Sequence, residues 1–427
     1  MRGLHAINSR PLTQRALRWL VLACRLCAPV SLVFLGGCGQ GHSNGARVST
    51  GIDKRDVGSI DEAELSGDGA FVAVRGSATS GHRGSPAESR VWLFGVDNAA
   101  IVAASPPGCE SMLPDWGPDG SYLLALGGNG LFGSGWQLYY ASGPRAPPRP
   151  LAGRGRQLLE LPWPSWDSRL GPDGKLALVT VRAPKIMDKA RWFAVLAVPL
   201  DSRGPARTLW SVRTDGWVYP LGVYPRPGPQ GGSMAVFAGG PWPPHDDCRI
   251  IALSVPDGAV LWDVPFAEWG WFNDAALYDP GTLLVLEETE RLEAEKESSI
   301  VYAVDLGTGD SRVFAQVPDE CRWVRVFPAA KGRRLLLAGD FDVWSVLIDG
   351  VPGKPEQVVQ GPASLRTRTA GARYSAEHGL EVYAWSWHVL WRCRLGDRQV
   401  QPVLGKPQAE GDEPPRILRL VPRVNQQ

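Results

Sequence analysis

The chain has 427 residues, with 45 Lys and Arg against 44 Asp and Glu, so its formal net charge is only +1. This balance argues against a protein that binds nucleic acid or another polyanion, since such proteins carry a clear basic excess. The 50 glycines, 37 prolines and 18 tryptophans indicate many turns around a large apolar core, which is typical of an all-β protein.

The first 37 residues have the pattern of an export signal. Five arginines precede the apolar stretch Leu26–Leu35, and no acidic residue lies among them. Ten apolar residues are too few to span a bilayer but have the length of a signal-peptide core. We therefore expect this segment to be removed from the mature protein.

The signal ends in Leu35-Gly36-Gly37-Cys38, which resembles the lipobox of bacterial lipoproteins. The resemblance implies cleavage between Gly37 and Cys38, and acyl chains such as palmitate on the Cys38 residue. Gly39, in place of Asp, implies a protein of the outer membrane facing the periplasm, with the inner membrane as the alternative. An ordinary cleaved signal followed by a coincidental cysteine is the other interpretation.

The composition divides the mature chain into two parts. Residues 38–56 are rich in Gly and polar residues, so we expect a flexible tether. Residues 57–427 carry the apolar runs and are predicted to form one folded domain, expected to be a monomer.

A repeat runs through this domain. Short turn sequences that contain glycine recur before apolar runs, at spacings of 47 to 58 residues. This period is the length of one blade of a β-propeller with generous loops. The seven glycines are Gly69, Gly120, Gly174, Gly232, Gly281, Gly332 and Gly379.

The clearest turn is Gly117-Pro118-Asp119-Gly120, directly before the run Tyr122–Leu126. Pro presets one dihedral angle, Asp accepts local backbone hydrogen bonds, and Gly tolerates a positive φ. Each unit continues with two further apolar or alternating segments, which makes four strands per unit. A continuous apolar run indicates a strand covered on both faces, and sheets around a common axis provide this cover for one another.

Trp116-Gly117-Pro118-Asp119-Gly120 resembles the repeat of TolB-type propellers, and the stretches Ile250–Val264 and Val301–Asp310 resemble the quinoprotein-like repeat. Both families are WD40-like β-propellers. The predicted fold is therefore an all-β, seven-bladed β-propeller of four-stranded antiparallel sheets, with eight blades as the alternative. We expect the last segment, Pro415–Val424, to pair with the first blade near Val57–Leu65 and so to close the ring.

Cysteine use agrees with export, because Cys24 and Cys27 leave with the signal. Four cysteines remain in the folded domain besides the lipidated one. They allow three disulfide pairings or buried free thiols, and sequence does not choose among these. These cysteines are Cys109, Cys248, Cys321 and Cys393.

No H-E-x-x-H, G-x-S-x-G or P-loop motif occurs, so we assign no catalytic residue, metal or cofactor. Propellers usually bind partners through the loops of one face. One candidate ligand face combines indole rings for stacking with polar and acidic groups, although packing between blades would explain the same residues. Its members are Trp242, His245, Asp246, Asp247, Trp269, Trp271 and Asp274.

Two functions are consistent with these features. The first is a lipid-anchored propeller of the cell envelope that acts as a noncatalytic scaffold for other envelope proteins, which is also what the resemblance implies. The second is an enzyme, or a propeller that binds a small ligand or metal through its axial pocket and one loop face.

Overall fold

The structure is a computed structural model. It describes residues 57–77, 89–105, 110–111, 113–117, 119–127, 136–146, 148–151, 160–161, 165–171, 175–182, 191–200, 206–214, 216–228, 231–240, 248–255, 257–265, 271–289, 298–329, 332–339, 342–361, 368–407 and 412–422. Within these ranges, no helix has the length and hydropathy needed to cross a bilayer. Residues 1–56, with the predicted signal, Gly37, Cys38 and the tether, lie outside the described part, so these features and the domain boundaries stay predictions.

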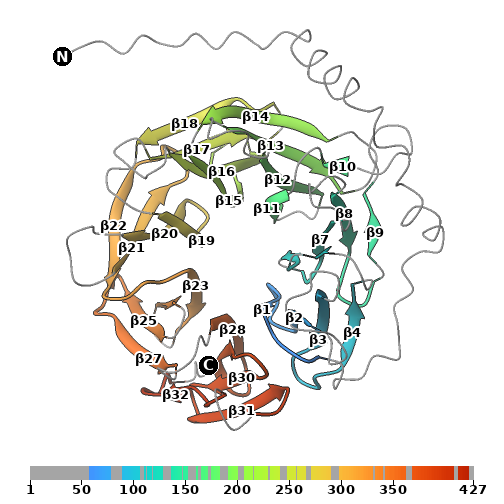
Figure 1. Cartoon of the computed structure of the whole chain (residues 1–427). Coiled ribbons are helices and arrows are strands. Elements are labelled where there is room, and N and C mark those ends of the chain that lie inside the picture. The colour runs from blue at the N-terminus through green and yellow to red at the C-terminus, as the bar shows by residue number, and fades with distance from the viewer. Residues whose placement is uncertain are drawn as a thin grey trace, which may run out of the picture. The chain divides into compact units, whose positions relative to one another are not determined.

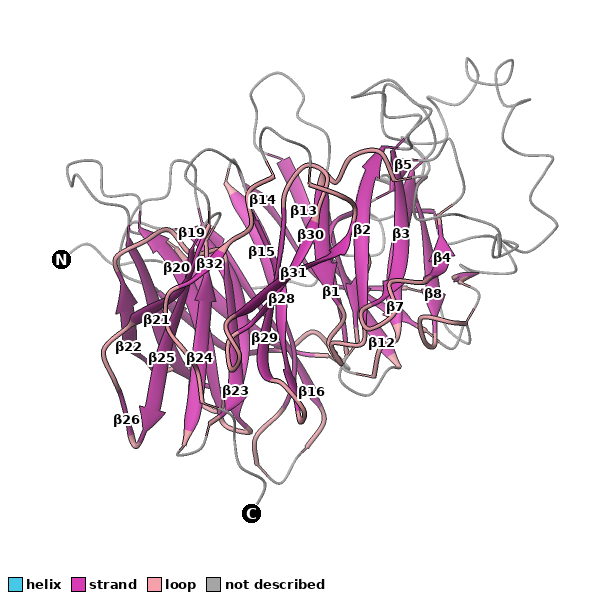
Figure 2. Ribbon diagram, turned by 90° about the horizontal axis from the view of Figure 1, so that it is seen from below, coloured by secondary structure: helices cyan, strands magenta, loops and turns pink. Residues whose placement is uncertain are grey.

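Seven antiparallel sheets surround a common axis, and we call each sheet a blade (Figure 1). In each blade the chain moves outward from an innermost first strand to an outermost last strand. The predicted seven-bladed propeller is thus confirmed, and the eight-bladed alternative is wrong. Viewed from the side, the strands of the blades stand as a layer of long ribbons (Figure 2).

The first three blades take the chain to residue 214. Blade 1 contains β1 (Glu62–Leu65), β2 (Phe71–Ser77), β3 (Ser89–Gly95) and β4 (Ile101–Ala104). Blade 2 contains β5 (Glu110–Ser111), β6 (Asp115–Trp116), β7 (Tyr122–Gly127), β8 (Trp136–Ala141), β9 (Arg149–Pro150) and β10 (Glu160–Leu161), so its first and last strands are each broken in two. Blade 3 contains β11 (Ser165–Leu170), β12 (Leu176–Arg182), β13 (Arg191–Pro199) and β14 (Arg207–Thr214).

The remaining four blades follow the same order. Blade 4 contains β15 (Trp217–Pro225), β16 (Ser233–Gly240), β17 (Arg249–Ser254) and β18 (Val260–Pro265). Blade 5 contains β19 (Trp271–Asp279), β20 (Thr282–Thr289), β21 (Ser298–Asp305) and β22 (Ser311–Val317). Blade 6 contains β23 (Trp323–Pro328), β24 (Arg333–Ala338), β25 (Asp342–Asp349), β26 (Val351–Pro352), β27 (Glu356–Gln360) and β32 (Arg416–Ile417). Blade 7 contains β28 (Arg368–Ser375), β29 (Gly379–Trp385), β30 (Leu390–Arg394) and β31 (Gln399–Leu404).

The repeated glycines lie where the sequence predicts them, between the first and second strands of their blades; only Gly174 is outside the described residues. In the second blade Gly120 has φ +78°, and the Asp119 carboxylate accepts the N–H of Ser121 at 3.0 Å. The expected turn chemistry is therefore present there. Gly281 differs, because it lacks a left-handed φ and instead donates its N–H to Asp279 at 2.9 Å.

The second strand of each blade is buried on both faces, as the continuous apolar runs predict. In β24, Leu335 and Leu337 pack against blade 5, whereas Leu336, which points to the opposite face, packs against blade 7. All three side chains are inaccessible to solvent. Burial of each leucine contributes about 1.5–3 kcal/mol, so neighbouring blades are the main source of each other's stability.

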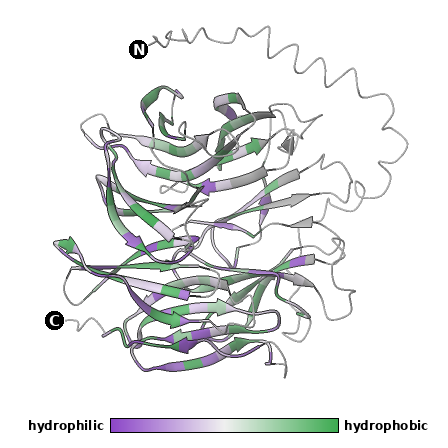
Figure 3. Ribbon diagram, turned by 60° about the vertical axis from the view of Figure 1, so that its left-hand side comes forward, coloured by the Kyte–Doolittle hydropathy of each residue, from purple (hydrophilic) through white to green (hydrophobic). Residues whose placement is uncertain are grey.

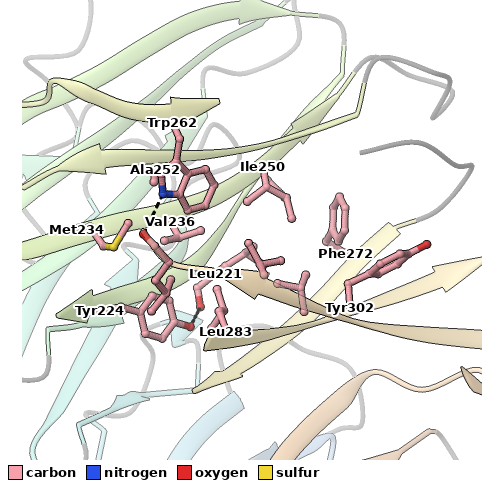
Figure 4. Packing of buried hydrophobic residues seen from close by; sticks show 14 of the residues in the cluster. Leu221, Tyr224, Met234, Val236, Ile250, Ala252, Trp262, Phe272, Leu283 and Tyr302 are labelled. Carbon is pink, nitrogen blue, oxygen red and sulfur yellow. Dashed lines mark hydrogen bonds between the residues drawn. The ribbon is translucent and has the colours of Figure 1, made fainter. Parts of the chain in front are cut away.

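The contact between blades 4 and 5 shows this packing in detail (Figure 4). Ile250 and Val236 from blade 4 meet Phe272 and Leu283 from blade 5. The Trp262 indole N–H donates to the Leu306 carbonyl oxygen at 3.1 Å, which satisfies the one polar atom of this ring. Coloured by hydropathy, the strands show hydrophobic segments alternating with hydrophilic ones (Figure 3).

The C-terminal segment does not close the ring in the predicted way. β32 pairs with β27, the outer strand of blade 6, through Val359 opposite Ile417. The expected pairing with the first blade is therefore wrong. The segment follows β31, the outermost strand of blade 7, and so reaches the outer edge of blade 6 at β27 and not the innermost strand β1 of blade 1.

The C-terminal segment instead fastens blade 6 to blade 7. The backbone N–H of Val421 donates to the Leu395 carbonyl oxygen at 3.1 Å. The buried Asp412 carboxylate accepts from the Ser386 hydroxyl at 2.7 Å and lies 3.0 Å from Nδ1 of His388. The pairing of β32 with β27 covers the outer edge of β27 at Val359 and Gln360.

The ring closes where blade 7 meets blade 1, and we call this contact the closing seam. Its apolar part brings Tyr383 and Trp385 against Val74 and Trp92. One main-chain hydrogen bond, from the Ile60 N–H to the Trp387 oxygen at 2.6 Å, also crosses it. No strand is shared between the two blades in the described part of the chain, so side-chain interactions have to hold the ring shut.

A buried ion network crosses the closing seam. Glu381, a fully buried residue of β29, accepts from Nε of Arg373 at 2.7 Å and from Nε of Arg394 at 2.9 Å. Arg373 also reaches blade 1, where it donates to the Gly69 carbonyl at 3.2 Å and to Asp97 at 2.7 Å. One guanidinium therefore links the buried carboxylate of the last blade to two turns of the first.

We expect the Glu381→Gln substitution to weaken ring closure. It leaves two arginines without their buried counter-charge, which should lower the free energy of unfolding by about 3 kcal/mol. Urea unfolding of the purified full chain, followed by tryptophan fluorescence, measures this loss. Glu356→Gln is the matched control, since its pair with Arg419 is exposed and should contribute less than about 1 kcal/mol. Equal losses in the two variants would contradict the assigned role.

The network also predicts a dependence of stability on pH. Burial alone raises the pKa of Glu381, but the hydrogen bond and charge of Arg373 and the hydrogen bonds from Arg394 and Tyr383 outweigh it and bring the pKa below its ordinary value of 4.5. A lowered folded-state pKa contributes stability above the unfolded-state value and loses it as pH falls through the folded-state value. The free energy of unfolding should thus decrease below about pH 5, and less steeply in Glu381→Gln. Parallel profiles for the two proteins would show that another group is responsible.

Candidate functional site in the axial channel

A cavity of about 610 Å³ lies on the axis of the propeller, and we call it the axial channel. Residues from the first strands of all seven blades line it, among them Glu64, Asp115, Arg169, Tyr224, Asp274 and Arg325. Every blade thus contributes its innermost strand to one shared space. Residues as far apart in the sequence as Glu64 and Ala372 converge in the channel.

Charged residues occupy the same level of the channel in three blades. Glu64, Arg169 and Arg325 each pair with the residue four positions after the turn glycine of their blade. Since the turn glycines repeat, equal register places these residues at a similar depth along the axis. The level is therefore polar, in contrast to the apolar contacts between blades.

Glycines occupy this level in two other blades. Gly222 and Gly371 pair with Val236 and Tyr383, again four residues after the turn glycine, and each follows a β-bulge. Gly371 has φ +144°, and a Cβ there would lie 2.8 Å from Cβ of Leu65 in blade 1. A glycine is thus needed for the first strands of blades 7 and 1 to approach each other closely.

Two ion pairs connect neighbouring blades across the channel wall. Arg169 of blade 3 lies 3.9 Å from Asp115 of blade 2. Arg325 of blade 6 donates from Nη1 to Asp274 of blade 5 at 2.5 Å, and the same carboxylate oxygen accepts the backbone N–H of Val324 at 3.1 Å. Asp274 is buried, so its negative charge is balanced by a partner and held in one orientation.

Tyr224 lies among these charges. It is buried, and its hydroxyl donates to the Leu221 carbonyl oxygen at 2.8 Å. Burial and the nearby Asp274 charge raise the pKa of this phenol, while Arg169 and Arg325 oppose the rise. The hydroxyl stays protonated at physiological pH. Because the fields of both arginines reach the same hydroxyl, the two ion pairs lie within electrostatic range of one another.

Aromatic rings adjoin the charged groups. The Arg325 guanidinium lies over the Trp323 ring, 5.0 Å from its centroid. Trp116 packs edge-on against Tyr122 at 5.5 Å, and its buried indole N–H has no acceptor among the described residues. Burial raises the pKa of Tyr122 to about 12. The channel therefore combines fixed charges with rings that can cover an apolar group.

The predicted ligand face lies mostly outside the described residues. This applies to Trp242, His245, Asp246, Asp247 and Trp269, and also to the side chain of Trp271. Asp274 is the one member whose side chain is described, and it belongs to the channel. The face therefore stays a prediction.

Sequence reasoning missed the arginines of the channel. Arg169 and Arg325 lie in the first strands of their blades, β11 and β23, which precede the turns. The usable signal is a charge inside an innermost strand, since such a charge has to face the axis or find a partner between blades. The pairing with Asp115 and Asp274 is invisible in sequence, because it joins separate blades.

The described cysteines are buried thiols and form no disulfide with one another. They are Cys248, Cys321 and Cys393. Burial raises the pKa of Cys321, and it raises that of Cys393 to about 12. The sequence left open whether the cysteines form disulfides or are buried free thiols, and these three are buried free thiols. Cys109 lies outside the described residues.

Two further arrangements of polar side chains bear on possible chemistry. Among the described residues, no group of three or more His, Cys, Asp or Glu side chains could hold a metal ion. Ser386, His388 and Asp412 come together, but the serine hydroxyl donates to the aspartate at 2.7 Å. A nucleophilic serine would donate to the histidine instead, so the geometry is that of a structural contact.

No protein-family model matches the chain, and no curated protein matches it. Many solved structures do. A puromycin-hydrolysing peptidase of Mycobacterium tuberculosis is 15% identical, with a TM-score of 0.50, covering 86% of this chain and 57% of its own.

Two further solved structures are similar at lower TM-scores. Hydrazine synthase of Kuenenia stuttgartiensis is 12% identical, with a TM-score of 0.48 over 84% of this chain and 99% of its own. The β-propeller domain of the Trilobed protease from Pyrococcus furiosus is 10% identical, with a TM-score of 0.48 over 81% and 94%. At such low identity the likeness concerns the fold alone.

We expect Gly371→Ala to destabilise the chain more than Gly228→Ala. Both glycines have positive φ, but a Cβ at Gly228 meets nothing within 4 Å. In the control, backbone strain alone should lower the free energy of unfolding, by about 1–2 kcal/mol. In Gly371→Ala the contact with Leu65 should lower the free energy of unfolding by about 1–3 kcal/mol more. Thermal and urea unfolding of the full chain measure both values. Equal losses would mean that the first strands of blades 7 and 1 do not depend on this close approach.

Proposed function

We propose that this chain is a lipid-anchored protein of the bacterial cell envelope that acts as a noncatalytic platform for other envelope proteins. The N-terminal pattern supports the anchor, since a basic region, an apolar core and Leu35-Gly36-Gly37-Cys38 follow in the order of a lipoprotein signal. The lipid on Cys38 would hold the propeller at the membrane, with residues 38–56 as a tether.

One observation carries the platform role. The buried carboxylate of Asp274 is committed to a backbone N–H and to Arg325, so it holds neighbouring blades together. A carboxylate that transfers protons needs access to the reacting group. Charges fixed in ion pairs are instead suited to recognition, because binding then costs little ordering of side chains.

The axial channel favours a second candidate function, that of a propeller binding a small ligand. Its volume of about 610 Å³ lies within the range of small-molecule sites, and such sites combine apolar walls with a few placed polar groups. An enzyme that binds its substrate in this channel is included in this second candidate function.

The anchor is tested by metabolic labelling with palmitate in a bacterial host. We expect the wild-type chain to incorporate label and to fractionate with membranes, and Cys38→Ala to do neither. Cys27→Ala, inside the predicted signal, is the matched control and should behave as wild type. A labelled Cys38→Ala chain, or a mature protein that keeps residues before Cys38, would contradict the anchor.

The platform is tested by site-specific photo-crosslinking in native membranes. A crosslinker replaces Arg322, which lines the channel and is half exposed, or Val313 on the outermost strand of blade 5. We expect the channel position to capture one envelope protein reproducibly and the outer position not to capture it. A stoichiometric metal or chromophore in the purified chain would favour the second candidate instead.

A further inference from the structure

Arg325 lines the axial channel and has two guanidinium nitrogens without an acceptor among the described residues. Its Nη1 donates to Asp274 and to the Val324 carbonyl oxygen. Nε and Nη2 have no acceptor among the described residues, and 39% of the side chain is exposed in the wall of the cavity. These two donors are parallel and form the side of a guanidinium that binds a carboxylate with two hydrogen bonds.

The position of this edge is fixed before any ligand arrives. Asp274 holds one end of the guanidinium, and the Trp323 ring lies under its face. Asp274 is itself held by the N–H of Val324. Because two contacts already fix the Arg325 guanidinium, binding a ligand costs little side-chain entropy, which favours a specific site.

The charges of the channel select the kind of anion. Its lining contains the carboxylates of Glu64, Asp115 and Asp274 besides the arginines. Three arginines, Arg169, Arg322 and Arg325, balance these acids. The lining therefore has no excess positive charge to attract a phosphate with two negative charges, whereas a single carboxylate places one charge next to Arg325.

The wall beside Arg325 leaves room for the rest of such a ligand. The next blade contributes Ala370, Gly371 and Ala372 to the lining, so no side chain there is longer than a methyl group. We propose that the axial channel binds a ligand with a carboxylate group, which the Nε and Nη2 edge of Arg325 receives while Asp274 acts as its positioning residue. The proposal rests on the second candidate function, that of a small-ligand site in the channel.

Calorimetric titration of the full chain in detergent micelles tests the proposal. The probe is N-acetyl-phenylalanine, whose ring suits the aromatic walls, and the matched control is its amide, which lacks the charge. Inorganic phosphate is a third probe. We expect saturable binding of the acid and at least about tenfold weaker binding of the amide and of phosphate.

A ten-residue peptide ending in phenylalanine, as acid and as amide, separates two sources of the carboxylate. Tighter binding of the peptide acid than of the free probe indicates the C-terminus of a polypeptide. Tighter binding of the free probe indicates a small molecule. Both results support the proposed chemistry.

Arg325→Lys keeps the charge opposite Asp274 but removes the two-donor edge. We expect it to weaken binding of the acid about tenfold. Arg249→Lys is the matched control, since Arg249 makes a similar pair with Asp263 on outer strands and does not line the channel. Arg249→Lys should bind as wild type.

Three outcomes would overturn the proposal. They are equal binding of acid and amide, unchanged binding by Arg325→Lys, and no saturable binding of any carboxylate probe. Each leaves the platform role standing, because that role is tested separately by labelling and crosslinking in membranes.

Discussion

The whole structure depends on sheets that cannot bury their own faces. Leu335, Leu336 and Leu337 are consecutive in one strand, point alternately to opposite sides, and are all inaccessible to solvent. Such a strand is stable only between two neighbours, so a row of blades would leave two apolar faces in water. Closing the row into a ring removes both, which makes the closing seam the contact on which the other blades rely.

The seam is closed by side chains from sequence-distant blades. Glu381 is buried, and two arginines balance its charge, one of which continues to Asp97 and the Gly69 carbonyl in blade 1. A buried ion network contributes less to net stability than an apolar contact of equal size, but it tolerates only one arrangement of its partners. The network therefore specifies which blade follows the last one, while the apolar cluster supplies most of the free energy.

The channel is a consequence of the same closure. Closing seven sheets brings their first strands to the axis, where Asp115 meets Arg169 and Asp274 meets Arg325. These pairs neutralise charges at the blade contacts and leave Nε and Nη2 of Arg325, a lining residue, without an acceptor among the described residues. One set of interactions thereby stabilises the ring and defines the chemistry of its centre, which is why the channel, and not a single loop, is the best-supported site.

Local chemistry in the sequence was sufficient for the fold class and the number of blades. Gly120 and Asp119 shape their turn through contacts within five residues, and continuous apolar runs such as the one in β24 indicate strands covered on both faces. Because these contacts join residues close in sequence, a repeated sequence pattern is enough to predict them. The closing contact was not, since Arg373 and Asp97 are 276 residues apart and the expected partner of the C-terminal strand was wrong. The pairing of Arg325 with Asp274 was equally hidden, because the ring alone decides which innermost strands face each other at a given depth.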